Sequence, residues 1–229
     1  DLNFLSENIF FRKVKEDILV NGKISHKKLD INEKNLSLFK SLFPEIDLDK
    51  IRLSSKNNFS FKINNKFKFI DLKLDSKVSI DEFSLINNLN LNNFFPNTKE
   101  NIYFSDHELS IKYDKDDLSI DGKGNILLQD ENDIIRYSIN KKNDNLDFEA
   151  LLEIENNPIN IDFLNYEKNK KNEALIHLVG LKNKKDEIFI KTLSINEGKN
   201  KIKIEGLDLN KKLEIIELRS INLDYIDKE

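Results

Sequence analysis

Apolar and polar residues alternate with a period of two along almost the whole chain. Clear runs are Phe59-Ser60-Phe61-Lys62-Ile63 and Leu109-Ser110-Ile111-Lys112-Tyr113. Successive side chains of a β-strand point to opposite sides of a sheet, so the pattern predicts strands with one apolar and one solvated face. Further runs of the same kind are Leu72/Leu74, Val78/Ile80, Leu118/Ile120, Ile135/Tyr137/Ile139, Leu146/Phe148/Ala150, Ile159/Ile161/Phe163, Ile188/Ile190, Ile202/Ile204 and Ile221/Leu223/Tyr225. Because the runs start about 8–15 residues apart, we expect an all-β fold, mainly an antiparallel meander of hairpins.

Two short segments depart from this alternation. Leu36, Phe39, Leu42 and Phe43 fall on one face of a helix, and Pro44 ends that pattern. A weaker version of the same pattern, apolar residues followed by a proline, lies over Leu89–Pro96. The sequence therefore predicts one or two short helices or turns that plug one end of a sheet.

The connections between runs are short and polar. The chain has only 6 Gly and 3 Pro, so Asn and Asp are expected to take the left-handed turn positions that glycine usually fills. The Lys168–Lys171 run is interpreted as a solvated hairpin tip. We expect a helix-containing β section over residues 1–100 and a regular meander over 101–229 that continues the same sheet, with Asn87–Lys99 as the best internal boundary. Because the chain starts at Asp1 and contains no Met, we expect a fragment of a longer protein.

Two shapes are compatible with this periodicity. In a sandwich, the apolar faces of two stacked sheets form a closed core. In a single long sheet that curls along its length, the same residues line a trough, and a dozen strands would extend about 55 Å. The alternation does not choose between the two shapes.

Few residues of the sequence suggest a catalytic or metal-binding site. The absence of Cys excludes disulfide scaffolds, thiol nucleophiles and thiolate metal sites. His26, His107 and His177 lack metal-ligand spacing and are interpreted as surface or strand-face residues, while the aspartates of 114–121 lack calcium-loop spacing. A formal net charge of −4 argues against a dedicated nucleic-acid binder. We expect no enzyme, no metal and no cofactor.

The order of the segments resembles the C-terminal repeat region of AsmA-like proteins, the bacterial envelope family that includes YhdP and TamB. The stretches that carry the resemblance are Val20-Asn-Gly-Lys-Ile24, Phe59-Ser-Phe-Lys-Ile63, Phe69-Ile-Asp-Leu-Lys-Leu-Asp75, Leu118-Ser-Ile-Asp-Gly-Lys-Gly124, Phe163-Leu-Asn-Tyr-Glu-Lys168 and Lys201-Ile-Lys-Ile-Glu-Gly-Leu207. A short hydrophobic strand followed by a strand that ends in Gly is a repeated phrase typical of that family, and the similarity is spread over most of the chain.

This resemblance implies a non-enzymatic segment in the periplasm, tethered by an inner-membrane anchor outside this fragment. Its elongated sheet would roll into a taco whose hydrophobic groove carries phospholipid acyl chains between the inner and outer membranes, with possible envelope protein partners and a role in envelope maintenance. The residues expected to line the groove are Phe59, Phe61, Ile63, Leu109, Ile111, Tyr113, Leu118, Ile120, Phe148 and Ile161. The alternative is a structural or adhesive β-solenoid or sandwich with a closed apolar core.

Overall fold

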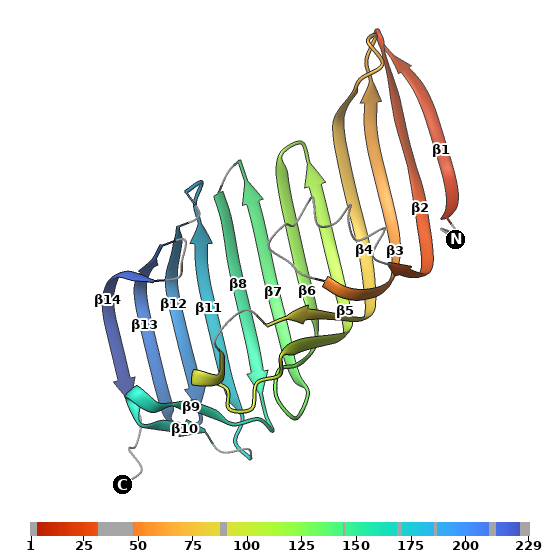
Figure 1. Cartoon of the computed structure of the whole chain (residues 1–229). Helices are drawn as coiled ribbons and strands as arrows, with labels where there is room; N and C mark the ends of the chain where they lie inside the picture. The colour runs from red at the N-terminus through yellow and green to blue at the C-terminus, as the bar shows by residue number, and fades with distance from the viewer. Residues whose placement is uncertain are drawn as a thin grey trace.

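One antiparallel sheet of 12 strands dominates the computed structural model, which describes residues 4–31, 48–87, 91–143, 145–168, 171–185, 187–210 and 214–224. The first six strands in the sheet are β1 (Phe4–Val14), β2 (Asp17–Ile31), β3 (Leu48–Ile63), β4 (Phe69–Ile86), β5 (Asn101–Asp114) and β6 (Asp117–Leu127). The other six are β7 (Asp133–Lys142), β8 (Asn145–Ile154), β11 (Ala174–Lys182), β12 (Ile188–Glu197), β13 (Asn200–Leu209) and β14 (Ile215–Asp224). They follow one another across the sheet in chain order (Figure 1).

Tight turns make this order possible. The β1–β2, β5–β6, β7–β8 and β12–β13 connections are two-residue loops, because the last residue of one strand pairs with the first residue of the next. Their first loop residues, Lys15, Lys115, Asn143 and Gly198, all have φ between 56° and 60°. Such left-handed loops match the twist of a hairpin. The turns thus use Lys as well as the expected Asn and Gly.

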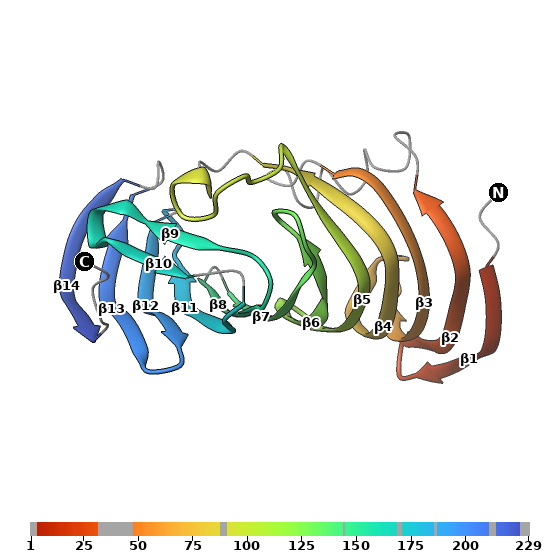
Figure 2. The ribbon, with the colours of Figure 1, turned by 90° about the horizontal axis from the view of Figure 1, so that it is seen from below.

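Irregularities in the strand register curl the sheet. Asn8, Lys28, Asp71 and Asp106 have positive φ and lie at or beside register shifts of the pairs β1–β2, β2–β3, β3–β4 and β5–β6. An extra residue at such a bulge bends the strand and increases its twist. Viewed along the strands, the sheet forms a trough that is open on one side (Figure 2).

One row of directly paired residues crosses all 12 strands and defines the two faces of the sheet. In strand order it consists of Ser6, Ile24, Asn57, Ser76, Ile111, Ile120, Ile139, Phe148, Gly180, Ile190, Leu207 and Leu218. Directly paired residues point to the same side of a sheet. We call the side of this row the apolar face and the opposite side the polar face.

A small two-stranded sheet covers part of the apolar face. It pairs β9 (Ile159–Ile161) with β10 (Tyr166–Lys168), and the 3₁₀ turn η2 (Asp162–Leu164) joins them. Asn165, with φ 49°, ends η2 and turns the chain back. Because these residues leave the large sheet, β8 pairs directly with β11. The hairpin lies inside the trough near β11–β13 (Figure 2).

The expected fold class is confirmed, since the chain forms one curled, open, antiparallel sheet rather than two large stacked sheets. A second 3₁₀ turn, η1 (Leu91–Asn93), lies within the segment Leu89–Pro96 and confirms the expected short helical element there. The helix expected over Leu36–Phe43 lies outside the described residues. β4 and β5 pair along their lengths, so the sheet continues past the expected boundary near residue 100.

Candidate functional site

The apolar face is the candidate functional surface, and its burial differs between two sections. In the covered section, Ile154, Ala174, Ile195 and Ile202 of the large sheet pack against Ile159, Ile161 and Tyr166 of the hairpin, and all seven are at most 7% exposed. Phe95, Leu152, Leu164 and Ile176 pack against this cluster. This section is a closed core.

The open section is the same face around Ile111, Ile120, Ile139 and Phe148. These side chains follow one another on β5, β6, β7 and β8, and each remains partly exposed. Tyr113, Leu118 and Leu109 extend it along the strands and are also partly exposed. A contiguous strip of apolar side chains therefore keeps some contact with solvent.

The structure brings nine of the ten expected lining residues to this face of the large sheet. They are Phe59, Phe61, Ile63, Leu109, Ile111, Tyr113, Leu118, Ile120 and Phe148. The tenth, Ile161, lies on β9 and belongs to the closed core, where it is 4% exposed. It therefore faces the large sheet from the covering hairpin instead of lying within the sheet. The role of these residues in lipid binding remains a prediction.

Aromatic rings reinforce the apolar face at two places. Phe61 contacts both Phe59, with ring centroids 5.9 Å apart, and Phe69, at 5.2 Å. Phe83 stacks on Phe104 of the neighbouring strand at 4.5 Å. Such contacts stabilise neighbouring strands beyond the burial of their area.

His107 is buried on the apolar face beside the second aromatic pair. Its ring lies 5.6 Å from that of Phe83 and 5.4 Å from that of Phe104, and its Nε2 is 3.0 Å from the Asn125 carbonyl oxygen. Burial lowers the pKa of His107 below 6.5, although the Asn125 hydrogen bond and the Asp106 carboxylate oppose the shift. A Cβ on Gly124 would overlap this ring, so glycine at position 124 leaves the space that the imidazole occupies.

Tyr137 is the second titratable group near the centre of this face. Its hydroxyl lies 3.4 Å from His107 Nδ1. Burial raises the pKa of Tyr137 to about 12, so the phenol is neutral at physiological pH. The pair therefore adds two hydrogen-bonding groups to the apolar face.

A further polar interruption lies on β2, β3 and β4. His26 pairs with Ser55, and Asn57 pairs with Ser76, all on the apolar face. His26 is 5% exposed and Ser76 is 2% exposed. Sequence reasoning missed this cluster, although the in-phase order Leu53-Ser55-Asn57-Phe59 carries its signal.

Hydrogen bonds fix the covering hairpin to the ends of the neighbouring strands. Lys168 Nζ donates to the Glu155 carbonyl oxygen at 3.1 Å and to the Asn157 carbonyl oxygen at 2.7 Å. Asn157 Nδ2 donates to the Asp133 carboxylate at 2.7 Å. The Tyr166 hydroxyl donates to Glu197 Oε2 at 3.0 Å. The covered section is thus held by directional bonds as well as by apolar packing.

The burial of Lys168 contradicts one expectation from the sequence. It was expected at a solvated hairpin tip, but its side chain is 0% exposed, so that interpretation is wrong for this residue. Burial lowers the pKa of Lys168, whereas the carboxylates of Asp133, Glu197 and Glu155 act in the opposite direction. Burial likewise raises the pKa of Asp133, against the effect of its hydrogen bond from Asn157. The run of three lysines in Lys168–Lys171 therefore includes one lysine that is buried and donates to backbone carbonyl oxygens.

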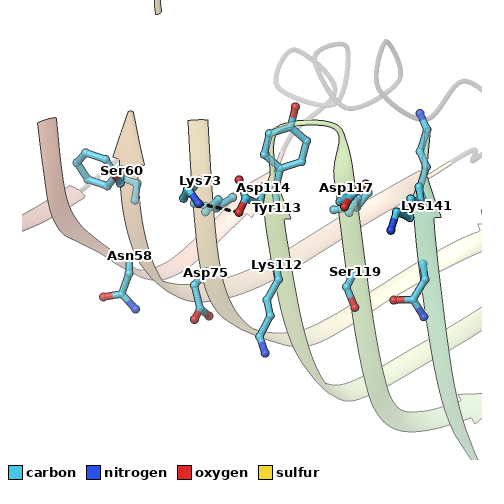
Figure 3. A pocket seen from close by; sticks show the side chains of 15 residues that line it. Asn58, Ser60, Lys73, Asp75, Lys112, Tyr113, Asp114, Asp117, Ser119 and Lys141 are labelled. Carbon is cyan, nitrogen blue, oxygen red and sulfur yellow. Dashed lines mark hydrogen bonds and ion pairs between the residues drawn. The ribbon is translucent and has the colours of Figure 1, made fainter. Parts of the chain in front are cut away.

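The polar face has a different character. A hollow of about 550 Å³ is bordered by three successive residues from each of β3 to β7, and ten of these fifteen residues point to the polar face by register. Figure 3 shows Asn58, Asp75, Lys112 and Ser119 in one row across neighbouring strands. Lys73 and Asp114 form an ion pair at 2.7 Å beside this row. Paired charges of this kind suit solvent better than acyl chains.

His177 also lies on the polar face, where its Nε2 is 2.6 Å from Glu149 Oε1. Among the described residues, no group of three or more His, Asp and Glu side chains has the geometry to hold a metal ion. No helix in the described ranges is long and apolar enough to cross a membrane.

The comparisons with protein families, with curated proteins and with solved structures return no match for this chain.

Proposed function

We propose that the apolar face is a hydrophobic groove that holds phospholipid acyl chains and lets them move across the sheet between two membranes. This is the function that the resemblance to AsmA-like proteins implies, with the periplasm as the compartment and an anchor outside these residues. The observation that carries the proposal is the open section, where Ile111, Ile120, Ile139 and Phe148 remain partly exposed. The same chain buries equivalent positions of the covered section almost completely.

The energetics support this reading. An acyl chain in water exposes apolar surface at a cost of about 0.8 kcal/mol per CH₂ group. A strip of Ile, Leu and Phe side chains removes part of that cost at every strand. Because the strip repeats from β5 to β8 with similar residues, neighbouring positions bind an acyl chain with similar strength, which favours sliding over trapping.

The second candidate is a structural or adhesive β domain whose apolar face is only its core. The covered section favours this reading, because there the chain supplies its own second layer. The two candidates differ in what they require of the open section. A groove needs lipid contact there, and a structural domain does not.

The substitution Ile120→Asp tests the proposal near the middle of the strip. We expect the variant to stay folded and to lose most of its photo-crosslinking to phospholipid that carries a diazirine at the acyl end. The matched control is Ser119→Asp, which puts the same charge on the adjacent residue of β6, on the polar face. The control is expected to label like the wild type.

Two results would count against the groove. One is a wild-type protein that never labels above a level set by a protein without an apolar groove. The other is an Ile120→Asp protein that labels as strongly as Ser119→Asp. Circular dichroism on the same samples establishes that each variant is folded, so a loss of labelling is not mistaken for unfolding.

A further inference from the structure

Four polar side chains interrupt the apolar face where it crosses β2, β3 and β4. They are His26, Ser55, Asn57 and Ser76, and we call them the polar subsite. His26 lies directly opposite Ser55, and Asn57 lies directly opposite Ser76. Their register neighbours on the same face are apolar, namely Ile24, Leu53, Phe59, Leu74 and Val78. A compact polar patch is thus enclosed by apolar side chains.

The hydrogen bonds within the subsite leave the hydroxyl protons of Ser55 and Ser76 available as donors. Asn57 Nδ2 donates to the Ile24 carbonyl oxygen at 3.2 Å and to Ser55 Oγ at 3.0 Å. Because Ser55 Oγ accepts from Asn57, its own hydroxyl proton points elsewhere. Ser76 Oγ is buried and has no hydrogen-bond partner within the described part of the chain.

A buried hydroxyl without a partner destabilises a fold, and native proteins retain few of them. Alanine would fill the position of Ser76 without this penalty. Ser55 and Asn57 are partly exposed, so a group that rests on the subsite meets them first. The unused donors face the same side of the sheet as the proposed acyl-chain strip.

We infer that the polar subsite binds the uncharged glycerol-ester region of a lipid whose acyl chains lie on the open section, an inference that rests on the proposed function. The hydroxyl groups of Ser55 and Ser76 suit the carbonyl oxygens of esters, which accept hydrogen bonds and carry no net charge, whereas the Asn57 amide already donates to Ile24 and Ser55. The register neighbours named above are apolar, so the surroundings of the patch favour the uncharged esters over a charged phosphate. The phosphate therefore stays on the solvent side of the trough.

The register fixes the orientation of this lipid. From Ser76 the directly paired row continues through Ile111, Ile120 and Ile139 to Phe148. At a strand spacing of about 4.8 Å, these four steps span about 19 Å. The ester region thus lies over β2–β4, and the acyl chains extend toward β8.

Two photoreactive forms of phosphatidylglycerol test this orientation. One carries a diazirine beside the ester carbonyl, and the other carries it at the acyl end. Incubation of the whole chain with vesicles of each lipid, followed by illumination and peptide mass spectrometry, locates the labels. We expect the ester-side probe to label β2–β4 and the chain-end probe to label β5–β8.

The substitution Ser76→Ala then removes one donor from the subsite. We expect labelling by the ester-side probe to fall three- to tenfold, about the effect of one hydrogen bond, while labelling by the chain-end probe is unchanged. Thermal unfolding of Ser76→Ala should occur at or above the wild-type temperature, because the variant lacks the unpaired hydroxyl. Ser76→Thr keeps a hydroxyl and should restore labelling, and Ser110→Ala, on the polar face of β5, is the matched control.

The outcomes separate this inference from the proposed function. Even labelling of all strands by both probes, or an unchanged Ser76→Ala protein, overturns the subsite while lipid binding stands. Absence of labelling by both probes overturns the proposed function and the subsite together. A large fall in the unfolding temperature of Ser76→Ala assigns Ser76 a structural role and also overturns the subsite.

Discussion

The covered and open sections belong to one face of one sheet, yet one is a closed core and the other is partly exposed. Ile154 and Ala174 are 0% exposed beneath the hairpin, whereas Ile120 and Ile139 on neighbouring strands of the same sheet are partly exposed. The alternation of apolar residues is the same in both sections. The pattern along a strand thus fixes which side chains share a face, and a separate segment decides whether that face is closed.

The segment that closes the face is short and has few residues of its own to bury. Its strands β9 and β10 contain three residues each, and Ile159, Ile161 and Tyr166 supply its main apolar contacts. So small a layer needs additional fixing, and the bonds of Lys168, Asn157 and Tyr166 provide it. Buried polar groups stabilise only when their partners are in place, which makes this network a sensitive point.

The largest expected difference between the sections comes from one carboxylate placed in each. Ile154→Asp puts an unpaired carboxylate into the closed core and should lower the free energy of unfolding by about 3–5 kcal/mol, or raise the pKa of the new carboxyl so that it stays neutral. Ile120→Asp leaves the new charge within reach of water and should cost only about 1–2 kcal/mol. Urea unfolding, followed by circular dichroism, measures both.

Equal losses of stability in these two variants would contradict the comparison. A large loss at Ile120 would mean that the open section is as closed as the core, which would favour the structural alternative. Ile154→Val serves as the control for shape, since it removes one methylene without adding charge and should cost about 0.5–1.5 kcal/mol.

A smaller effect is expected when the covering hairpin loses one anchor. Lys168→Met leaves the carbonyl oxygens of Glu155 and Asn157 without their donor and should lower stability by about 1–3 kcal/mol. Hydrogen exchange should increase in residues 155–168 and remain unchanged in β3–β6. The control is Lys191→Met, which removes an exposed lysine paired with Asp147 at 3.2 Å and should change stability by less than about 0.5 kcal/mol. Uniform exchange across both regions would show that the hairpin is not a separate layer.

Much of the fold could be predicted because the alternation is regular and the turns are short. Phe59, Ile111, Ile120 and Phe148 share a face as their phase indicates, and the two-residue loops of four hairpins make the strands that they join pair with each other. The hairpin could not be predicted in the same way. The run that includes Ile159 and Ile161 alternates like a strand of the large sheet, and this periodicity is the same whether a strand joins a sheet or stacks on it.

The site was predictable only in its apolar part. Lys168 was expected in solvent because a run of charges usually marks a turn, and its burial depends on carbonyl groups that distant backbone geometry brings together. His107 stands in phase with Leu109 and Ile111, so its location on the apolar face follows from the pattern. Its burial depends on the space above Gly124 of the next strand, which requires knowledge of the register.

The smallest expected effect is a pH dependence that arises in the part of the apolar face outside the closed core. Burial lowers the pKa of His107, so the folded protein holds this imidazole neutral at a pH where the unfolded chain protonates it. Below about 6.5 the unfolded state therefore binds more protons, and stability falls as the pH falls from that value through the lower pKa of the folded state. A single proton limits the slope to about 1.4 kcal/mol per pH unit.

Urea unfolding of the wild type and of His107→Phe between pH 7.5 and about 5 measures this slope, and the variant should lose less stability than the wild type over this range. His107→Gln, which cannot titrate but retains a hydrogen-bond donor for the Asn125 carbonyl oxygen, must change the slope in the same way. If the wild type and both variants have parallel pH profiles, His107 is protonated equally in the folded and unfolded states, and this region would then be as accessible to water as the polar face.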